Sequence, residues 1–106
     1  MIPVEELRRS AMAALFQGGE DAPISIFMTE FPRGRGPDLH LHPYPEVFLV
    51  EAGAALFTAG EERFTVTAEQ IVVVPAQTPH SFKGASDDIL RVVSVQPSPT
   101  VIQTDL

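Results

Sequence analysis

Four side chains able to bind a metal ion lie in two short stretches of the chain. The first stretch, HLHPYPE at residues 40–46, contains His40, His42 and Glu46. The third histidine of the chain, His80, lies in VPAQTPHSFKG. Three imidazoles and one carboxylate suit Fe, Mn, Ni, Zn or Cu, and such a set leaves positions on the ion for water or substrate. We therefore expect a divalent metal site if the fold brings these residues together.

The spacing in the first stretch fits a strand that ends in a bend. Alternate side chains of a strand share one face, so His40 and His42 point the same way. Pro43 and Pro45 cannot continue a paired strand, and the chain must bend there before Glu46 begins the next strand. The alternative is a surface His-x-His pair without a metal.

Three neighbouring residues have two interpretations each. Tyr44 is the only tyrosine, and its hydroxyl could act as an acid or orient a bound oxygen atom. The alternative is an aromatic side chain that points outward from a turn. Arg33 and Arg35 precede the site and would either hold a substrate carboxylate or remain solvated. Tyr44 is therefore the one candidate catalytic residue outside the ligand set.

The elements that must position these residues are short strands separated by turns. Ten prolines and seven glycines lie mostly between the apolar stretches, which favours an all-β sandwich or barrel. Residues 4–16 open with good helix formers and end before Gly18 and Gly19, which predicts a short N-terminal helix. The expected strands are 24–31, 39–42, 46–52, 55–59, 63–67, 70–75, 80–83 and 89–96.

Two of these strands have informative patterns. The run QIVVVP at 70–75 is continuously apolar and predicts a buried strand. In the last strand, Ser94 and Gln96 alternate with valines, and they either enter the barrel or mark its wetter face. Arg91 is either an internal ion or an edge charge. The residues expected in the core or in the lining of a pocket are Phe27, Met28, Phe31, Phe48, Phe57, Phe64 and Phe82.

Composition narrows the class of protein and its partners. The 106 residues predict one domain with its own core. Seven basic against 14 acidic residues give a net charge of −7, so neither nucleic acid nor an anionic membrane surface is expected as a partner. The chain has no cysteine, which excludes disulfides and thiolate ligands. With no signal-like segment and no apolar run of membrane-spanning length, we expect a cytoplasmic location.

The extended spacing resembles the first motif of the cupin superfamily. Gly34 is followed by five residues, then His40-x-His42, three residues, Glu46, six residues and Gly53. Every defining position of that motif is filled in this sequence.

The second cupin motif is matched in part. Its proline and histidine are present as Pro75 and His80, whereas Glu69, Gln77 and Gly84 stand where the motif has two glycines and an asparagine. Glu69 replaces a turn glycine that binds nothing, so we expect it to be neutral. Gln77 lies in the turn before His80. It either strains that turn, since glycine serves where φ is positive, or marks a turn that is built differently.

The resemblance implies a fold and a ligand set. The fold is a double-stranded β-helix, a small jelly-roll barrel with a pocket inside, whose core covers about residues 24–96 of a single domain 1–106. The metal ligands implied by position are His40, His42, Glu46 and His80.

The resemblance also implies two classes of function. The first is a small metal-dependent enzyme, of dioxygenase or isomerase type, that acts on a small organic molecule. The alternative is a non-catalytic binding or sensor cupin whose metal is structural or absent. Small cupins commonly form homodimers, and the N-terminal segment 1–16 is expected to contribute to that contact.

Overall fold

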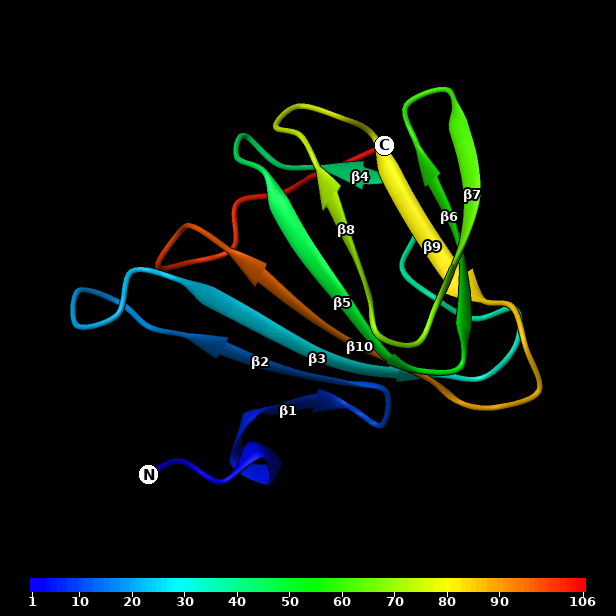
Figure 1. The fold of residues 1–106 in the computed structure, drawn as a ribbon. Coiled ribbons are helices and arrows are strands. Elements are labelled where there is room, and N and C mark those ends of the chain that lie inside the picture. The colour runs from blue at the N-terminus through cyan, green and yellow to red at the C-terminus, as the bar shows by residue number, and fades with distance from the viewer.

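The computed structural model describes residues 1–106 and is built almost entirely of strands (Figure 1). A single 3₁₀ turn, η1, covers Val4–Leu7. The strands are β1 Arg8–Ser10, β2 Ala13–Gln17, β3 Ser25–Phe31, β4 His40–Leu41, β5 Glu46–Ala52, β6 Ala54–Ala59, β7 Glu62–Thr67, β8 Gln70–Val74, β9 His80–Gly84, β10 Leu90–Gln96 and β11 Thr104–Asp105.

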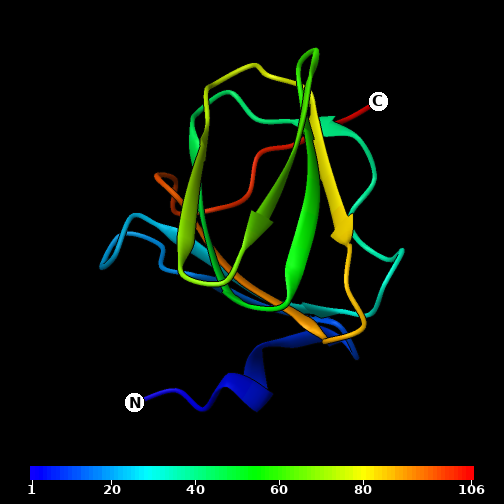
Figure 2. The same cartoon turned by 45° about the vertical axis from the view of Figure 1, so that its right-hand side comes forward.

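The strands form two antiparallel sheets that face each other. The larger sheet has six strands in the order β1-β2-β3-β10-β5-β8, and the smaller has five in the order β11-β4-β9-β6-β7. From β3 onward the chain passes to the opposite sheet at each connection, except in the β6–β7 hairpin. This winding closes a barrel, and Figure 2 shows its strands from a second side. It is the winding of a double-stranded β-helix, as predicted.

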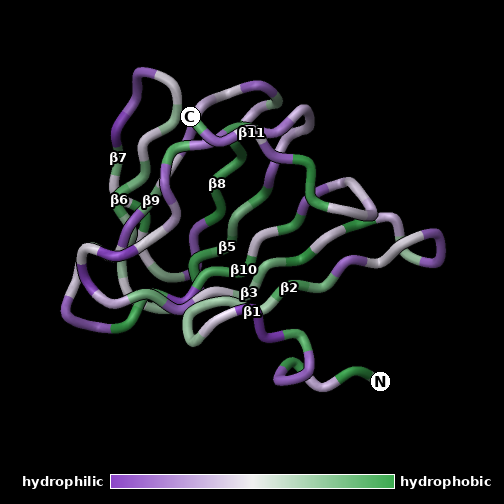
Figure 3. The backbone as a smooth tube through the Cα atoms, turned by 180° about the vertical axis from the view of Figure 1, so that it is seen from behind, coloured by the Kyte–Doolittle hydropathy of each residue, from purple (hydrophilic) through white to green (hydrophobic).

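The core lies between the two sheets and is dominated by phenylalanine rings. The ring centroid of Phe57 lies 5.1 Å from that of Phe48 and 4.9 Å from that of Phe82. Such edge-to-face and stacked pairs add to the stabilisation from burial. Of the predicted core residues, Phe31, Phe48, Phe57 and Phe82 are buried, and Phe64 packs against them. In Figure 3 hydrophobic segments run along β3, β5 and β10, and the tips of several loops are hydrophilic.

The predicted N-terminal helix is reduced to the single turn η1. The residues after it form β1 and β2, and β2 ends at Gln17, just before the two glycines. Leu15 of β2 lies opposite Phe27 of β3, and both Ala14 and Leu15 are buried. Strand pairing gives the backbone N–H and C=O groups hydrogen-bond partners and buries these apolar side chains. Together these gains outweigh a weak local preference for helix.

The prediction that 70–75 is a buried strand is wrong. β8 is an edge strand of the larger sheet, and no second layer covers its outward face. The same face is exposed on the neighbouring β5, where Val47 and Leu49 are 39% and 37% exposed. Ile71 and Val73 on that face are 64% and 61% exposed, whereas Val74 is buried. An apolar run does not distinguish a strand covered on both faces from a strand covered on one face.

Strand β10 resolves two open alternatives. Ser94 and Gln96 are buried, so the polar members of the alternation face the barrel interior. Arg91 is not an internal ion, and it is not at a sheet edge either, because β10 lies between β3 and β5. Its side chain is 58% exposed, and its Nε lies 3.8 Å from Glu30 Oε1.

Candidate metal centre

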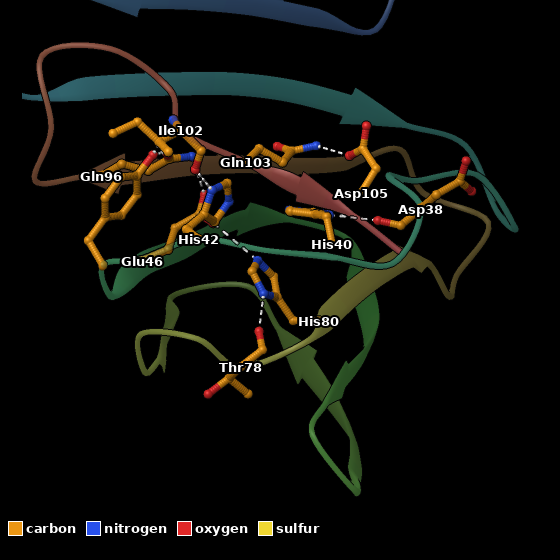
Figure 4. A network of polar contacts seen from close by, with 11 residues as sticks. Asp38, His40, His42, Glu46, Thr78, His80, Gln96, Ile102, Gln103 and Asp105 are labelled. Carbon is orange, nitrogen blue, oxygen red and sulfur yellow. Dashed lines mark hydrogen bonds and ion pairs between the residues drawn. The ribbon is translucent and has the colours of Figure 1, made fainter.

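The four predicted ligands converge at one end of the barrel (Figure 4). All four are buried, and their ligand-capable atoms lie within 4.8 Å of one another. His40 belongs to β4, His42 follows it, and Glu46 and His80 open β5 and β9. The fold thus brings together residues up to 40 positions apart in the sequence. Their role as metal ligands stays a prediction that this geometry supports.

The local sequence explains how the first three residues reach the centre. His40 and His42 lie on one face of an extended segment, as predicted from alternation, and their ring centroids are 5.0 Å apart. The two prolines lie between β4 and β5, where the strand is interrupted, also as predicted. Glu46 then enters the larger sheet opposite Val74. The bend turns the carboxylate back toward the imidazoles.

Each imidazole is oriented by a backbone carbonyl oxygen. A carbonyl oxygen only accepts, so each Nδ1 carries the proton and donates, which leaves the lone pair of a neutral ring on Nε2. The Nδ1–O distances are 2.6 Å from His40 to Asp38, 2.8 Å from His42 to Ile102 and 2.8 Å from His80 to Thr78.

The donor set fits a cation. Oε1 of Glu46 lies 3.1 Å from Nε2 of His42 and 3.2 Å from Nε2 of His80. Despite that distance, Nε2 of His42 is buried and has no hydrogen-bond partner. Imidazole lone pairs that face a carboxylate oxygen repel it unless a positive charge lies between them. A divalent ion held by these atoms would satisfy all of them at once.

The electrostatics of the cluster keep Glu46 charged and His40 neutral. Burial opposes ionisation of Glu46, but its close contacts with His42, His80 and Ser94 outweigh this and lower the pKa of this carboxyl to about 2. Burial lowers the pKa of His40, and the neighbouring histidines lower it further. Burial also acts to lower the pKa of His42, but its contact with Glu46 outweighs this and raises it. An ionised carboxylate and a neutral imidazole are the forms that bind a metal.

A second layer of contacts holds the carboxylate in place. Nε2 of Gln96 donates to Oε2 of Glu46 at 3.0 Å, and the hydroxyl of Tyr44 donates to Oε1 of Gln96. The backbone N–H of Ile102 donates to the Tyr44 hydroxyl at 3.0 Å. The Tyr44 ring also stacks on His42, with centroids 5.2 Å apart and planes at 8°. The sequence left Gln96 without a role, and its only signal was a polar residue in an alternation of valines.

A cavity of about 230 Å³ lies beside the cluster. His40, His42 and Glu46 reach its wall, and Tyr44, Arg33 and Arg35 do not. The other polar lining residues are Thr29, Ser94, Gln96 and Gln103, and the apolar ones are Ala13, Phe27, Phe31, Pro37, Phe48 and Phe82.

In the turn that precedes His80, Gln77 replaces the glycine of the second cupin motif but has the positive φ that favours glycine. Gln77 has φ of 59°, and its N–H donates to the carbonyl oxygen of His42 at 2.8 Å. Of the two predicted alternatives, the strained turn is therefore the one found. Glu69, which we expected to be neutral, also has a positive φ, of 69°. Both replacements thus occupy backbone positions that favour glycine.

Comparison with known proteins assigns the family. Residues 27–96 match the family model of the cupin domain, and the chain belongs to this family. Among curated proteins, it is 31% identical over 68 residues to a mannose-1-phosphate guanylyltransferase of Salmonella muenchen. That match covers 64% of this chain and 14% of the guanylyltransferase, so this chain corresponds to a small part of that protein.

Solved structures with a similar fold include oxalate decarboxylases. That of Bacillus subtilis, described for its Mn(II) centres, has a TM-score of 0.84 and 17% identity over 97% of this chain and 31% of its own. That of Lactobacillus farciminis, a formate complex, has a TM-score of 0.82 and 19% identity over 96% of this chain and 34% of its own. This chain therefore spans about a third of each oxalate decarboxylase chain.

A third similar structure has nearly the same length as this chain. It is a Klebsiella pneumoniae protein with a double-stranded β-helix domain, with a TM-score of 0.81 and 16% identity over 99% of this chain and 95% of that one. At these identities the likeness confirms the predicted fold. No helix of this structure has the length and apolar character needed to cross a membrane.

Proposed function

We propose that this cupin binds one divalent transition metal and acts as a small metal-dependent enzyme, of dioxygenase or isomerase type, on a small organic molecule. The ligands would be His40, His42, Glu46 and His80. The observation that carries the proposal is the convergence of three imidazoles and a carboxylate beside a cavity. The Mn(II) centres of a structural neighbour agree with a divalent ion but do not select manganese for this chain.

The lining of the cavity limits the chemistry. A bound divalent ion supplies Lewis-acid polarisation of a substrate oxygen atom, and a redox-active ion also supplies electrons for dioxygen chemistry. The only titratable side chains on the cavity wall belong to the cluster. Burial raises the pKa of Tyr44, and its hydroxyl is already bonded to Gln96 and Ile102. Reactions that need a separate acid or base in the wall are therefore disfavoured.

The same observation supports a second candidate function. A site without an independent acid or base also suits a binding or sensor cupin, whose metal would be structural or absent. Binding of a small molecule without turnover separates this alternative from the enzyme.

The first experiment is metal analysis of the untagged chain. We expect about one equivalent of metal after loading with Fe, Mn, Ni, Zn or Cu in turn, and little in the His40→Ala/His42→Ala variant. A Glu61→Ala/Glu62→Ala variant, altered at the exposed β6–β7 turn, serves as the control and should bind normally. Anaerobic iron loading, oxygen uptake and isomerisation screens follow. The absence of bound metal in the native chain under every loading condition would overturn the proposal.

Three further expectations belong to this proposal. They are the single domain 1–106, the homodimer with residues 1–16 at its contact, and the cytoplasmic location. The one core shared by both sheets supports the first. The other two rest on the sequence.

A further inference from the structure

The cavity beside the cluster has no lysine or arginine on its wall. The nearby Arg33 faces elsewhere: its Nη2 lies 3.2 Å from Oδ1 of Asp87, and its Nη1 donates to the carbonyl oxygen of Ala85 at 3.3 Å. Arg35 is exposed and does not line the cavity. An anionic group at a distance from the cluster would therefore meet no opposite charge.

Three of the four polar side chains of the wall outside the cluster already have hydrogen-bond partners within the protein, and the fourth, Ser94, lies beside Glu46 of the cluster. The Thr29 hydroxyl donates to the carbonyl oxygen of Val92 at 3.3 Å, and Nε2 of Gln103 donates to Asp105 at 2.7 Å. Gln96 uses its amide on Glu46 and Tyr44. The rest of the wall is apolar and rich in phenylalanine. The wall thus provides one polar end, at the cluster, and an apolar body.

We propose that this cavity takes a molecule of about one substituted aromatic ring, with a single polar end directed at the cluster and no second charged group. The inference rests on the proposed function, whose site it shares. An apolar cavity of about 150 Å³ holds benzene, so a cavity of about 230 Å³ has room for a ring with a small substituent. A second carboxylate would be buried against phenylalanine without a partner, which is costly.

The test compares two ligands that differ in one group. 4-Methylphenol and 4-hydroxybenzoate share the phenol end, and the second has a carboxylate in place of the methyl group. Both are titrated calorimetrically into the metal-free full chain, with oxalate as a third ligand, because a carboxylate would bind a loaded Mn(II) ion directly. We expect 4-methylphenol to bind roughly 10- to 100-fold more tightly than 4-hydroxybenzoate. Equal or tighter binding of 4-hydroxybenzoate or oxalate within the cavity would overturn the inference.

A variant that supplies the missing charge provides the complementary test. Ala13 lies on the cavity wall and is only partly buried, so Ala13→Lys adds a cation without removing a phenylalanine. This variant should favour 4-hydroxybenzoate, and Ala13→Met should keep the native order. An unchanged order in Ala13→Lys would contradict the inference. If Ala13→Lys does not fold, the relative affinities of the two phenols for the native chain alone test the inference. A chain that takes up no metal contradicts the proposed function instead, and the metal-free titrations still test the cavity.

A second inference concerns the end of the chain, residues 97–106. This segment passes back over the site and makes hydrogen bonds with several parts of the barrel. Ser25 donates to the carbonyl oxygen of Ser98 at 2.7 Å, and β11 pairs with β4, with Asp105 opposite His40. Figure 4 shows Ile102 and Gln103 beside the histidines. The C-terminal segment is therefore part of the surroundings of the metal centre.

Ile102 connects this segment to two of the four cluster residues. Its carbonyl oxygen accepts from Nδ1 of His42, and its N–H donates to Tyr44. Tyr44 reaches Glu46 through Gln96. One residue of the segment thus fixes an imidazole directly and the carboxylate through two side chains.

We also infer that residues 97–106 are a positioning element of the metal centre, and that Tyr44 is a positioning residue within it. Partners that orient metal ligands typically change metal affinity by about 10- to 100-fold when they are lost. Tyr44 does not line the cavity, so it has no contact with a ligand there. Its hydroxyl acts by holding Gln96, which in turn holds the free oxygen of the carboxylate.

The test removes one hydroxyl. Tyr44→Phe keeps the stacked ring and should weaken Co(II) binding by about tenfold and shift the visible spectrum of bound Co(II). Thr67→Val, which removes a hydroxyl bonded to Gln70 far from the site, is the control. Ile102→Pro removes the N–H donor to Tyr44 and also fixes the backbone φ at this residue, so its effect should be at least as large as that of Tyr44→Phe. Unchanged affinity and spectrum in both variants would overturn the inference. The same follows if the only change is the stability of the metal-free protein.

Discussion

His40 and His80 are directly opposite each other across strands β4 and β9, and their ring centroids are 4.4 Å apart. This is the only residue pair that joins the two strands in the ladder. The position of β9 is also fixed by its other neighbour, β6, in which Ala59 lies opposite His80. Residues that are 40 positions apart therefore form one half of the candidate centre through sheet register.

The first prediction concerns the ligand contributed by β9. His80→Ala should weaken Mn(II) binding by more than about 100-fold, since the loss of an orienting partner alone costs 10- to 100-fold. The native chain should gain about 2.7 kcal/mol of stability at 100 times its Kd, and the variant should not. Thermal unfolding with and without Mn(II) measures this. Thr78→Ala is the control because the backbone carbonyl of Thr78, not its side chain, orients His80. A full Mn(II) stabilisation of His80→Ala would exclude this residue as a ligand.

The second prediction concerns pH and Glu46. The pKa of this carboxyl is about 2 in the folded chain, against an ordinary 4.5. Its ionised form therefore stabilises the metal-free protein above pH 4.5, and this contribution is lost as the pH falls from about 4.5 to about 2. The difference corresponds to at most roughly 3 kcal/mol.

Urea unfolding of metal-free protein between pH 2.5 and 6 measures this effect. The native chain should lose more stability on acidification than Glu46→Gln, whose side chain does not titrate. Glu30→Gln, at an exposed position beside Arg91, should follow the native curve. Parallel curves for the native chain and Glu46→Gln would show that the carboxylate has no such role.

The third prediction concerns the backbone of the turn before His80. Gln77 has a left-handed conformation that costs a residue with a side chain about 1–2 kcal/mol. Gln77→Gly should relieve that strain, but it also adds freedom to the unfolded chain, so we expect a net gain of up to about 1 kcal/mol. Gln77→Ala keeps the strain and should show no gain. Denaturant unfolding measures both variants. A loss of stability in Gln77→Gly would mean that the side chain, not the backbone, matters in this turn.

The fourth prediction concerns the homodimer. Met1, Ile2 and Val4 are exposed apolar residues outside the strands, and covering them in a partner contact would be favourable. Deletion of residues 1–7 should therefore shift the chain from dimer to monomer in sedimentation velocity. Ile71→Lys/Val73→Lys, on the exposed face of β8, should remain dimeric. If the deletion variant stays dimeric and Ile71→Lys/Val73→Lys becomes monomeric, the dimer contact lies at β8 instead. A monomeric native chain would refute the homodimer.

Much of the candidate site follows from local sequence. The alternation of His40 and His42, the bend at two prolines and the restart at Glu46 depend only on the period of a strand and on the missing N–H of proline. The strand stretches follow from β-branched and aromatic residues between turn residues. These rules act over a few residues, so the sequence alone determines which way neighbouring side chains point.

The tertiary structure decided which faces are covered and which distant residues meet. The same local pattern allows β8 to be buried or exposed, and the uncovered outward face of its sheet left Ile71 in solvent. Residues 13–17 became strand β2 because β3 provided a partner, and β1 pairs with β2 in turn. Helix propensity does not register such partners. Ile102 reaches His42 across 60 residues, and Gln96 reaches Glu46 across 50. Such contacts depend on how the sheets pair and pack, because side-chain spacing along one strand carries no information about the strand that will lie beside it.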